Sequence, residues 1–230
     1  MSWLRNPGFV LVRRPVPVTV GPGGFVPILV FAALFGGISA RAGMPVVTAI
    51  VVGALGGTAS LVAHELGHVR AARKVEGLRP LGVSLIALGA VTRLEGAYGS
   101  GRDQARVAIG GPKMSFEIAL SLVPALVLPI PLGMKEIAFA LAALNLGLAV
   151  LSLIPANPLD GYKVVVGLLW SALGSEAAAR RLIRRAVMPW AVVELVGTGV
   201  LLVERPFLGT TVIAIAASLF AQNRFTRRRA

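Results

Sequence analysis

The chain has 230 residues, of which 56% are hydrophobic and only 14% are charged, and its mean hydropathy is +0.80. This composition excludes an ordinary soluble domain and is typical of a polytopic membrane protein. Cysteine is absent, so disulfides and thiolate metal sites are excluded, and histidine, aspartate and glutamate are left as metal ligands. We expect the net charge of +13 to orient the loops and contact the lipid bilayer, and we expect no nucleic acid partner.

The N-terminal residues 1–24 are rich in arginine and proline, and Pro15 and Pro17 break the apolar stretch 9–20. These prolines exclude a spanning helix, so we predict an interfacial segment that could hold a short strand. The next apolar run, residues 25–40, predicts the first membrane helix. A cleaved signal peptide is the alternative there, because arginines precede the run and small residues follow it.

The second apolar run, residues 45–63, holds no charged residue and leads directly into His64. A run of this length can span a bilayer, and we predict a helix over residues 45–74. His64, Glu65 and His68 spell H-E-x-x-H and include both histidines of the chain. On a helix, residues four apart share a face about 6 Å apart along the axis, so the two imidazoles can hold one Zn²⁺ with Glu65 beside it. The simpler alternative is two surface histidines near a membrane edge.

Residues 82–94 are β-branched, too short to span a bilayer and interrupted by Gly89. They predict a β-hairpin packed beside the motif helix. At membrane depth such a hairpin must be buried in protein or line a cavity, because lipid cannot bond to its free backbone edge.

A third helix is predicted over residues 103–128, and we expect Gly110, Gly111 and Pro112 to interrupt it. Lys113 and Glu117 lie four residues apart on this helix, so we expect them to neutralise each other.

A fourth helix is predicted over residues 137–154, where Pro155 and Pro158 stop it just before Asp160. An ionisable residue at the end of a membrane helix is a functional candidate. The remaining chain predicts a short helix at 162–173 and two further spans at 188–203 and 206–221.

These elements predict an all-α polytopic membrane protein with about six transmembrane helices and a small membrane-associated β-hairpin or sheet. We expect a single transmembrane domain over residues 1–230, with a core at about 45–163 and accessory helices at 25–41 and 188–221. With both termini cytoplasmic, the outer loops hold only three of the 23 positive residues, namely Arg41, Lys135 and Arg205. The positive-inside rule therefore favours this orientation.

Two histidines need a third protein ligand to complete a zinc site. Asp160 is the best distant candidate; Asp103 sits among arginines at a helix start, where we expect it to be an N-cap. Glu117 and Glu194 are weaker alternatives, and Glu194 is expected to bond a neighbouring helix. Glu65 is expected to point aside from the ligand position and to take the proton of an attacking water, which predicts peptide hydrolysis.

The segment 64–68, His-Glu-Leu-Gly-His, followed by Pro-Leu-Asp-Gly at 158–161, resembles the site-2 protease family of intramembrane zinc metalloproteases. Gly-Pro at 111–112 and Asn-Leu-Gly-Leu-Ala at 145–149 also resemble that family, and the likeness covers residues 45–163. It implies one Zn²⁺ per chain bound by His64, His68 and Asp160, with Glu65 catalytic. It further implies a prokaryotic cell membrane protein that cleaves a single-span membrane substrate, such as an anti-sigma factor or a membrane-tethered regulator.

The chain departs from the family pattern at three positions. Ser152 and Ser115 stand where the family usually has asparagine, and Tyr162 stands where a second glycine often follows Asp-Gly. The candidate substrate-binding residues are Asn145, Ser152 and Asn157. The competing interpretations are a membrane metalloprotease of the prenyl-peptide kind, which would need a downstream glutamate ligand, and a non-proteolytic membrane-binding or chaperone protein that retains the fold.

Overall fold

The computed structural model describes residues 9–13, 16–21, 23–42, 45–87, 89–129 and 132–183, and it forms two compact units. The first unit is built from residues 1–99 and 106–153, and the second from residues 100–105 and 154–230. The predicted spans at 188–203 and 206–221, with Glu194, lie outside the described residues. A single domain over the whole chain stays a prediction.

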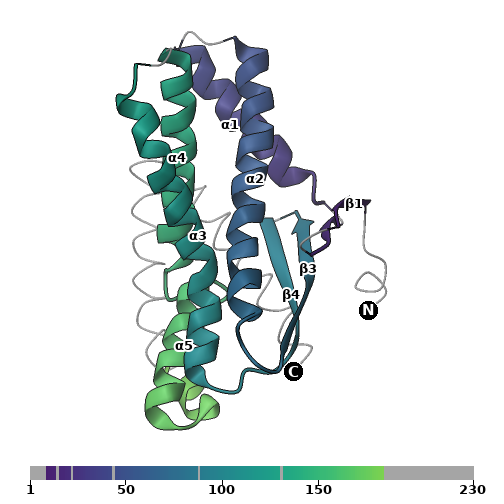
Figure 1. Cartoon of the computed structure of the whole chain (residues 1–230), viewed down its shortest axis with the longest axis vertical. Helices are drawn as coiled ribbons and strands as arrows, with labels where there is room; N and C mark the ends of the chain where they lie inside the picture. Colours follow the sequence, from purple (N-terminus) through teal and green to yellow (C-terminus); the bar gives the residue numbers. More distant parts are fainter. Residues whose placement is uncertain are drawn as a thin grey trace, which may run out of the picture. The chain divides into compact units, whose positions relative to one another are not determined.

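Helix α2 (Val46–Ala72) is the element around which the first unit packs, and it confirms the predicted motif helix (Figure 1). Its small residues let neighbouring helices come close. A Cβ atom at Gly53 or Gly57 would collide with Phe35 or Phe31 of α1 (Val26–Ala42), so the two aromatic rings fill the space that the glycines leave. Helix α1 confirms the first predicted helix.

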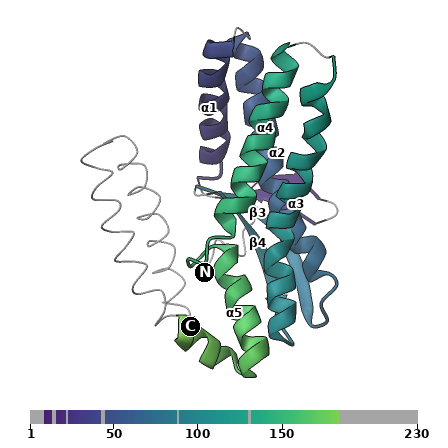
Figure 2. The ribbon, with the colours of Figure 1, turned by 90° about the vertical axis from the view of Figure 1, so that its left-hand side faces the viewer.

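Helix α4 (Leu132–Ser152) packs along a second line of α2, and both views show α4 beside the α1–α2 pair (Figures 1 and 2). Leu141 of α4 lies over Gly56, and the fully buried Asn145 donates from Nδ2 to Ser60 Oγ at 2.8 Å. A hydrogen bond between helices fixes their rotation as well as their distance, so this contact sets which face of α2 meets α4.

Helix α3 (Gly101–Val127) is continuous, so the predicted interruption at Gly110 to Pro112 is wrong. A proline inside a helix removes one backbone donor, which frees one carbonyl without ending the helix when neighbouring groups support it. The predicted Lys113–Glu117 pair is confirmed, with Nζ 3.8 Å from Oε1.

The start of α3 corrects the role expected for Asp103. The Asp103 amide donates to Ser100 Oγ at 3.2 Å, and the Ser100 hydroxyl donates to Asp103 Oδ2 at 2.7 Å. Ser100 is therefore the N-cap, and Asp103 is its hydrogen-bond partner in the first turn.

Four strands form one sheet in the order β1-β2-β3-β4, listed here as β1 (Phe9–Val12), β2 (Val18–Val20), β3 (Leu78–Ile86) and β4 (Gly89–Gly96). The β3–β4 hairpin confirms the hairpin predicted from residues 82–94. The N-terminal segment holds two strands, and β2 pairs with β3 in parallel. The fold is therefore mostly helical with a small mixed sheet. Val18, Val83 and Val69 belong to one buried cluster, which packs the sheet against α2.

In the second unit, α5 (Asp160–Leu173) packs against the first turn of α3. Gly101 and Gly167 lie so close that a Cβ atom on Gly167 would stand 2.5 Å from the Gly101 carbonyl oxygen. Gln104 Nε2 adds a hydrogen bond of 3.2 Å to the Lys163 carbonyl oxygen. Helix α5 ends at Gly174, whose φ of +67° is a left-handed conformation that glycine adopts without strain.

Within the described part of the chain, two helices are long and apolar enough to cross a membrane, Val46–Ala72 and Gly133–Ser152. A shorter apolar stretch occupies Val26–Gly37. Large apolar side chains on these helices are exposed, among them Val47 at 73% and Leu55 at 69%. Exposure of this kind fits contact with lipid. The count of six spans stays a prediction.

Candidate metal centre

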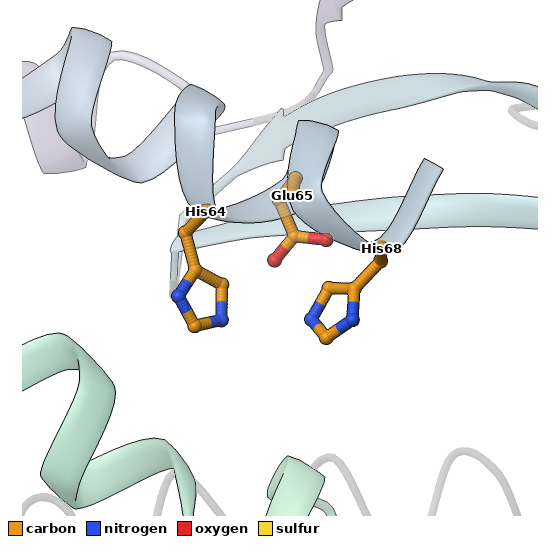
Figure 3. Close-up of side chains that lie close together, drawn as sticks. All are labelled: His64, Glu65 and His68. Atoms are coloured by element: carbon orange, nitrogen blue, oxygen red, sulfur yellow. The ribbon is translucent and has the colours of Figure 1, made fainter. Parts of the chain in front are cut away.

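His64, Glu65 and His68 project from one turn of α2 (Figure 3). Both histidines are buried, at 5% and 6% exposure, and their ring centroids are 5.2 Å apart. One nitrogen of each ring and one oxygen of Glu65 all lie within 4.8 Å of one another. The structure thus brings the three motif residues together, and Glu65 lies closer to the rings than its expected orientation suggested.

Helix α3 orients both imidazoles through their Nδ1 atoms. His68 Nδ1 is 2.8 Å from the Val107 carbonyl oxygen, which can only accept, so Nδ1 carries the proton and donates it. The Gly111 amide, 3.3 Å from the same nitrogen, is then a contact and not a hydrogen bond. His64 Nδ1 is 2.9 Å from Ser115 Oγ, and the hydroxyl oxygen can accept from the same tautomer. In this tautomer the Nε2 atom of each ring carries the lone pair that binds a metal.

Gly111 provides the space beside these two nitrogens. A Cβ atom at Gly111 would lie 2.6 Å from His64 Nε2 and would also collide with His68 Nε2. Both nitrogens therefore lie so close to Gly111 that only glycine fits at this position. The α2–α3 crossing is correspondingly tight, since a Cβ atom on Gly110 would stand 2.6 Å from the Gly67 carbonyl oxygen.

These contacts fit a bound zinc ion. In zinc sites one ring nitrogen of each histidine binds the metal. The other ring nitrogen donates a hydrogen bond to a carbonyl, a carboxylate or another acceptor. Val107 and Ser115 supply such acceptors, and both Nε2 atoms lie against Gly111, where a larger residue would collide with them. The donor set therefore suits zinc.

Strand β4 holds the third motif residue. The Thr92 hydroxyl lies 2.6 Å from Glu65 Oε2 and 3.0 Å from the Glu65 carbonyl oxygen. A hydroxyl has one proton, and the shorter contact to a charged oxygen is the stronger hydrogen bond. The sheet therefore anchors one oxygen of the Glu65 carboxylate.

Asp160 is the first residue of α5 in the second unit, 7% exposed, with Oδ1 3.0 Å from Lys163 Nζ. Its role as third zinc ligand stays a prediction. The weaker candidates in the described residues have their own contacts, Asp103 with Ser100 and Glu117 with Lys113.

Substrate binding by Asn145, Ser152 and Asn157 also stays a prediction. Asn145 links α4 to α2, Ser152 Oγ donates to the Ala149 carbonyl oxygen of its own helix at 3.2 Å, and Asn157 is exposed.

Sequence reasoning missed the roles of Ser115 and Thr92. Ser115 is separated from its partner by 51 residues and Thr92 by 27. The only signal was indirect: Ser115 occupies a position where the resembled family carries asparagine, and Thr92 lies in the hairpin expected beside the motif helix.

No family model matches the chain, but related sequences do, and three of them are described below. It is 34% identical over 119 residues to a protein of Synechocystis sp. named as a zinc metalloprotease, covering 51% of this chain and 31% of that protein. It is 35% identical over 145 residues to the zinc metalloprotease Rip3 of Mycobacterium tuberculosis, covering 60% and 36%. A zinc metalloprotease of Methanocaldococcus jannaschii is 32% identical over 116 residues, covering 50% and 33%. The match thus spans about a third of the length of these relatives.

The fold is similar to that of a solved protein, the Site-2 Protease from Methanocaldococcus jannaschii. The two chains superpose with a TM-score of 0.59 at 21% sequence identity, over 92% of this chain and 91% of that one. Fold and site together define a helical protein with an H-E-x-x-H metal centre on a helix long enough to cross a membrane. The comparisons confirm the resemblance to the site-2 protease family, and the related metalloproteases together with the His-Glu-His group support zinc as the cofactor.

Proposed function

We propose that this chain is an intramembrane zinc metalloprotease that hydrolyses a peptide bond within or near the cytoplasmic end of a membrane-spanning substrate. The observation that carries the proposal is the meeting of two imidazole Nε2 atoms at Gly111, beside a carboxylate, on a helix apolar enough to cross a membrane. A buried metal centre with a general base next to it is the arrangement that metal-dependent hydrolases use.

His64, His68 and Asp160 hold the ion in this proposal. Zinc, when bound, lowers the pKa of a water molecule towards 7 and polarises the substrate carbonyl. Glu65 accepts the proton of the attacking water and then delivers it to the leaving amine nitrogen. Val107 and Ser115 keep the imidazoles in the tautomer that presents Nε2, and Thr92 holds one oxygen of the base.

The depth of the metal centre in the membrane follows from the spacing between His64 and Arg70 on α2. Arg70 is exposed and lies six residues after His64, which is roughly 9 Å along a helix. If Arg70 marks the cytoplasmic interface, the centre lies within about 10 Å of that face. This orientation rests on the distribution of lysine and arginine, which also places both termini in the cytoplasm.

The substrate is a single-span membrane protein, such as an anti-sigma factor or another membrane-tethered regulator. The carbonyls of a spanning helix are already hydrogen-bonded, so the helix must unwind before it is cut. Unwinding costs least where glycine, proline or asparagine weakens the helix. We therefore expect cleavage in the cytoplasmic third of the span, next to such a residue.

The test uses the full chain in proteoliposomes with a single-span test substrate that contains an Asn-Pro pair. Wild-type protein should cleave it, lose activity with a chelator and regain activity with zinc. Glu65→Gln should keep its zinc and lose cleavage, because it retains the ligands and removes the base. Glu76→Gln is the matched control, since Glu76 is exposed beyond the end of α2.

Two results would overturn the proposal. Equal cleavage by wild-type protein and Glu65→Gln would reject the role of Glu65. Zinc-loaded wild-type protein without cleavage would favour the non-proteolytic membrane-binding or chaperone alternative. Moving the Asn-Pro pair along the substrate and mapping the products by mass spectrometry tests the depth, and cleavage that stays near the outer face would contradict it.

A further inference from the structure

Strand β4 packs beside α2, and its Thr92 side chain contacts Glu65 of the metal-binding motif. Thr92 is partly buried, and its hydroxyl lies 2.6 Å from Glu65 Oε2 across 27 residues of sequence. A hydroxyl that donates to a carboxylate forms a short, charge-assisted hydrogen bond. Thr92 therefore fixes the rotation of the carboxylate about its last side-chain bond.

The pairing of the sheet shows where the backbone of Thr92 points. The Val83 amide donates to the Pro17 carbonyl oxygen, and the Leu85 carbonyl accepts from Gly21, so the peptide groups of Val83 and Leu85 face away from β4. Thr92 pairs with Val83 across the hairpin. Because hydrogen-bonded and non-hydrogen-bonded pairs alternate in an antiparallel ladder, the peptide groups of Thr92 face the outer edge of β4.

This edge is open within the described residues, where β4 pairs with β3 alone. One residue thus touches the carboxylate with its side chain and borders the open edge with its backbone. The Thr92 hydroxyl thus links the strand directly to the Glu65 carboxylate.

We propose that Thr92 is a positioning residue that holds Glu65 Oε2, so that Oε1 is the oxygen presented to the attacking water. This inference rests on the proposed function. Without the hydroxyl the carboxylate rotates more freely, and fewer of its orientations suit proton transfer. The two histidine ligands are untouched, since α3 and not β4 orients them.

The experiment compares Thr92→Val, which keeps the β-branched shape, with Thr92→Ser, which keeps the hydroxyl. In the full chain in proteoliposomes, Thr92→Val should lower kcat by about 10- to 100-fold, the usual effect of losing a supporting hydrogen bond at a metal site. KM and zinc content should be unchanged, and Thr92→Ser should restore kcat. Val91→Thr is the matched control, because neighbouring strand residues point to opposite faces.

A second measurement does not depend on activity. The infrared carboxylate stretch of Glu65, identified by its loss in Glu65→Gln, should shift in Thr92→Val and stay unchanged in Thr92→Ser and Val91→Thr. An unchanged band with unchanged kcat in Thr92→Val would overturn the inference alone, and so would a fall in kcat that follows loss of zinc. Wild-type protein that binds zinc and cleaves nothing would overturn the proposed function and this inference together.

Discussion

The two sides of α2 at the metal centre are held in different ways. Towards α3, the histidines meet a glycine, a backbone carbonyl and the Ser115 hydroxyl, and Ser115 is fully buried. Towards the sheet, the Glu65 carboxylate accepts a hydrogen bond from the Thr92 hydroxyl, on a strand with an open edge in the described part of the chain. The histidines are oriented by groups of a crossing helix, whereas the base is oriented by one side chain of a strand. Metal affinity and proton transfer should therefore respond to different substitutions.

The largest effect is expected from a substitution at Gly111, on the histidine side of the centre. Gly111→Ala would place a methyl group against both Nε2 atoms, so zinc should bind more than about 100-fold more weakly, beyond the 10- to 100-fold cost of losing a supporting contact. Zinc titration of the purified protein measures this.

Gly147→Ala is the matched control for Gly111→Ala. Its added methyl meets nothing described within 4 Å, and an alanine inside a helix should stabilise the fold by about 0.5–1 kcal/mol. His64→Ala, which removes a ligand without a clash, should reproduce the zinc loss. Full zinc occupancy in folded Gly111→Ala would show that the ion sits elsewhere.

The next largest effect is expected at Asp160, the proposed third ligand, which belongs neither to α3 nor to the sheet. Asp160→Ala should lower bound zinc well below one ion per chain, because two imidazoles alone hold zinc weakly. Asp103→Ala is the control, since its carboxylate bonds Ser100 at the start of α3, and it should cost helix stability and leave zinc in place. One zinc per chain retained in Asp160→Ala would remove Asp160 from the ligand set.

Ser115→Ala should have a smaller effect on the ligand side. It removes the acceptor of His64 Nδ1, so zinc affinity should fall by about 10- to 100-fold. Ser121→Ala is the control, because Ser121 lies exposed on the same helix and donates to the Ile118 carbonyl oxygen of that helix. Isothermal titration with zinc would compare the two, and equal affinities would show that α3 does not orient His64.

The smallest effect is expected at the open edge of β4, where a substrate segment could pair as an added strand. Ala90 lies two residues before Thr92, so its amide also faces that edge. Ala90→Pro removes this donor and should slow cleavage several-fold with zinc retained, whereas Ala90→Val keeps the donor and should not. Unchanged cleavage rates in stable, zinc-loaded Ala90→Pro would show that the edge of β4 does not bind substrate.

Local patterns were sufficient to predict the helices and the hairpin. Long apolar runs predicted α1, α2 and α4, and a β-branched run around Gly89 predicted β3 and β4. Strands β1 and β2 have four and three residues, too few to show a periodicity, and β2 is fixed by pairing with residues more than 60 positions away. Continuity of α3 through Pro112 was likewise decided by its packing against α2 and not by the residue itself.

In the metal centre, too, some features follow from local sequence and others depend on contacts between distant segments. The spacing of His64 and His68 follows from helix geometry, so the sequence predicted their shared face. The contacts of Ser115, Val107 and Gly111 depend on where α2 and α3 cross, at Gly67 and Gly110. No local pattern specifies that crossing, and the resemblance pointed to Gly111 without giving the reason for a glycine there.

Anomalous diffraction at the zinc edge, from crystals of the zinc-loaded chain, tests the central claim most directly. We predict one peak per chain beside Gly111, about 2.0–2.1 Å from Nε2 of both His64 and His68, with Glu65 Oε2 still on the Thr92 hydroxyl and outside the ligand set. Zinc bound through Nδ1, or through a Glu65 oxygen released from Thr92, would contradict the separate control of ligands and base.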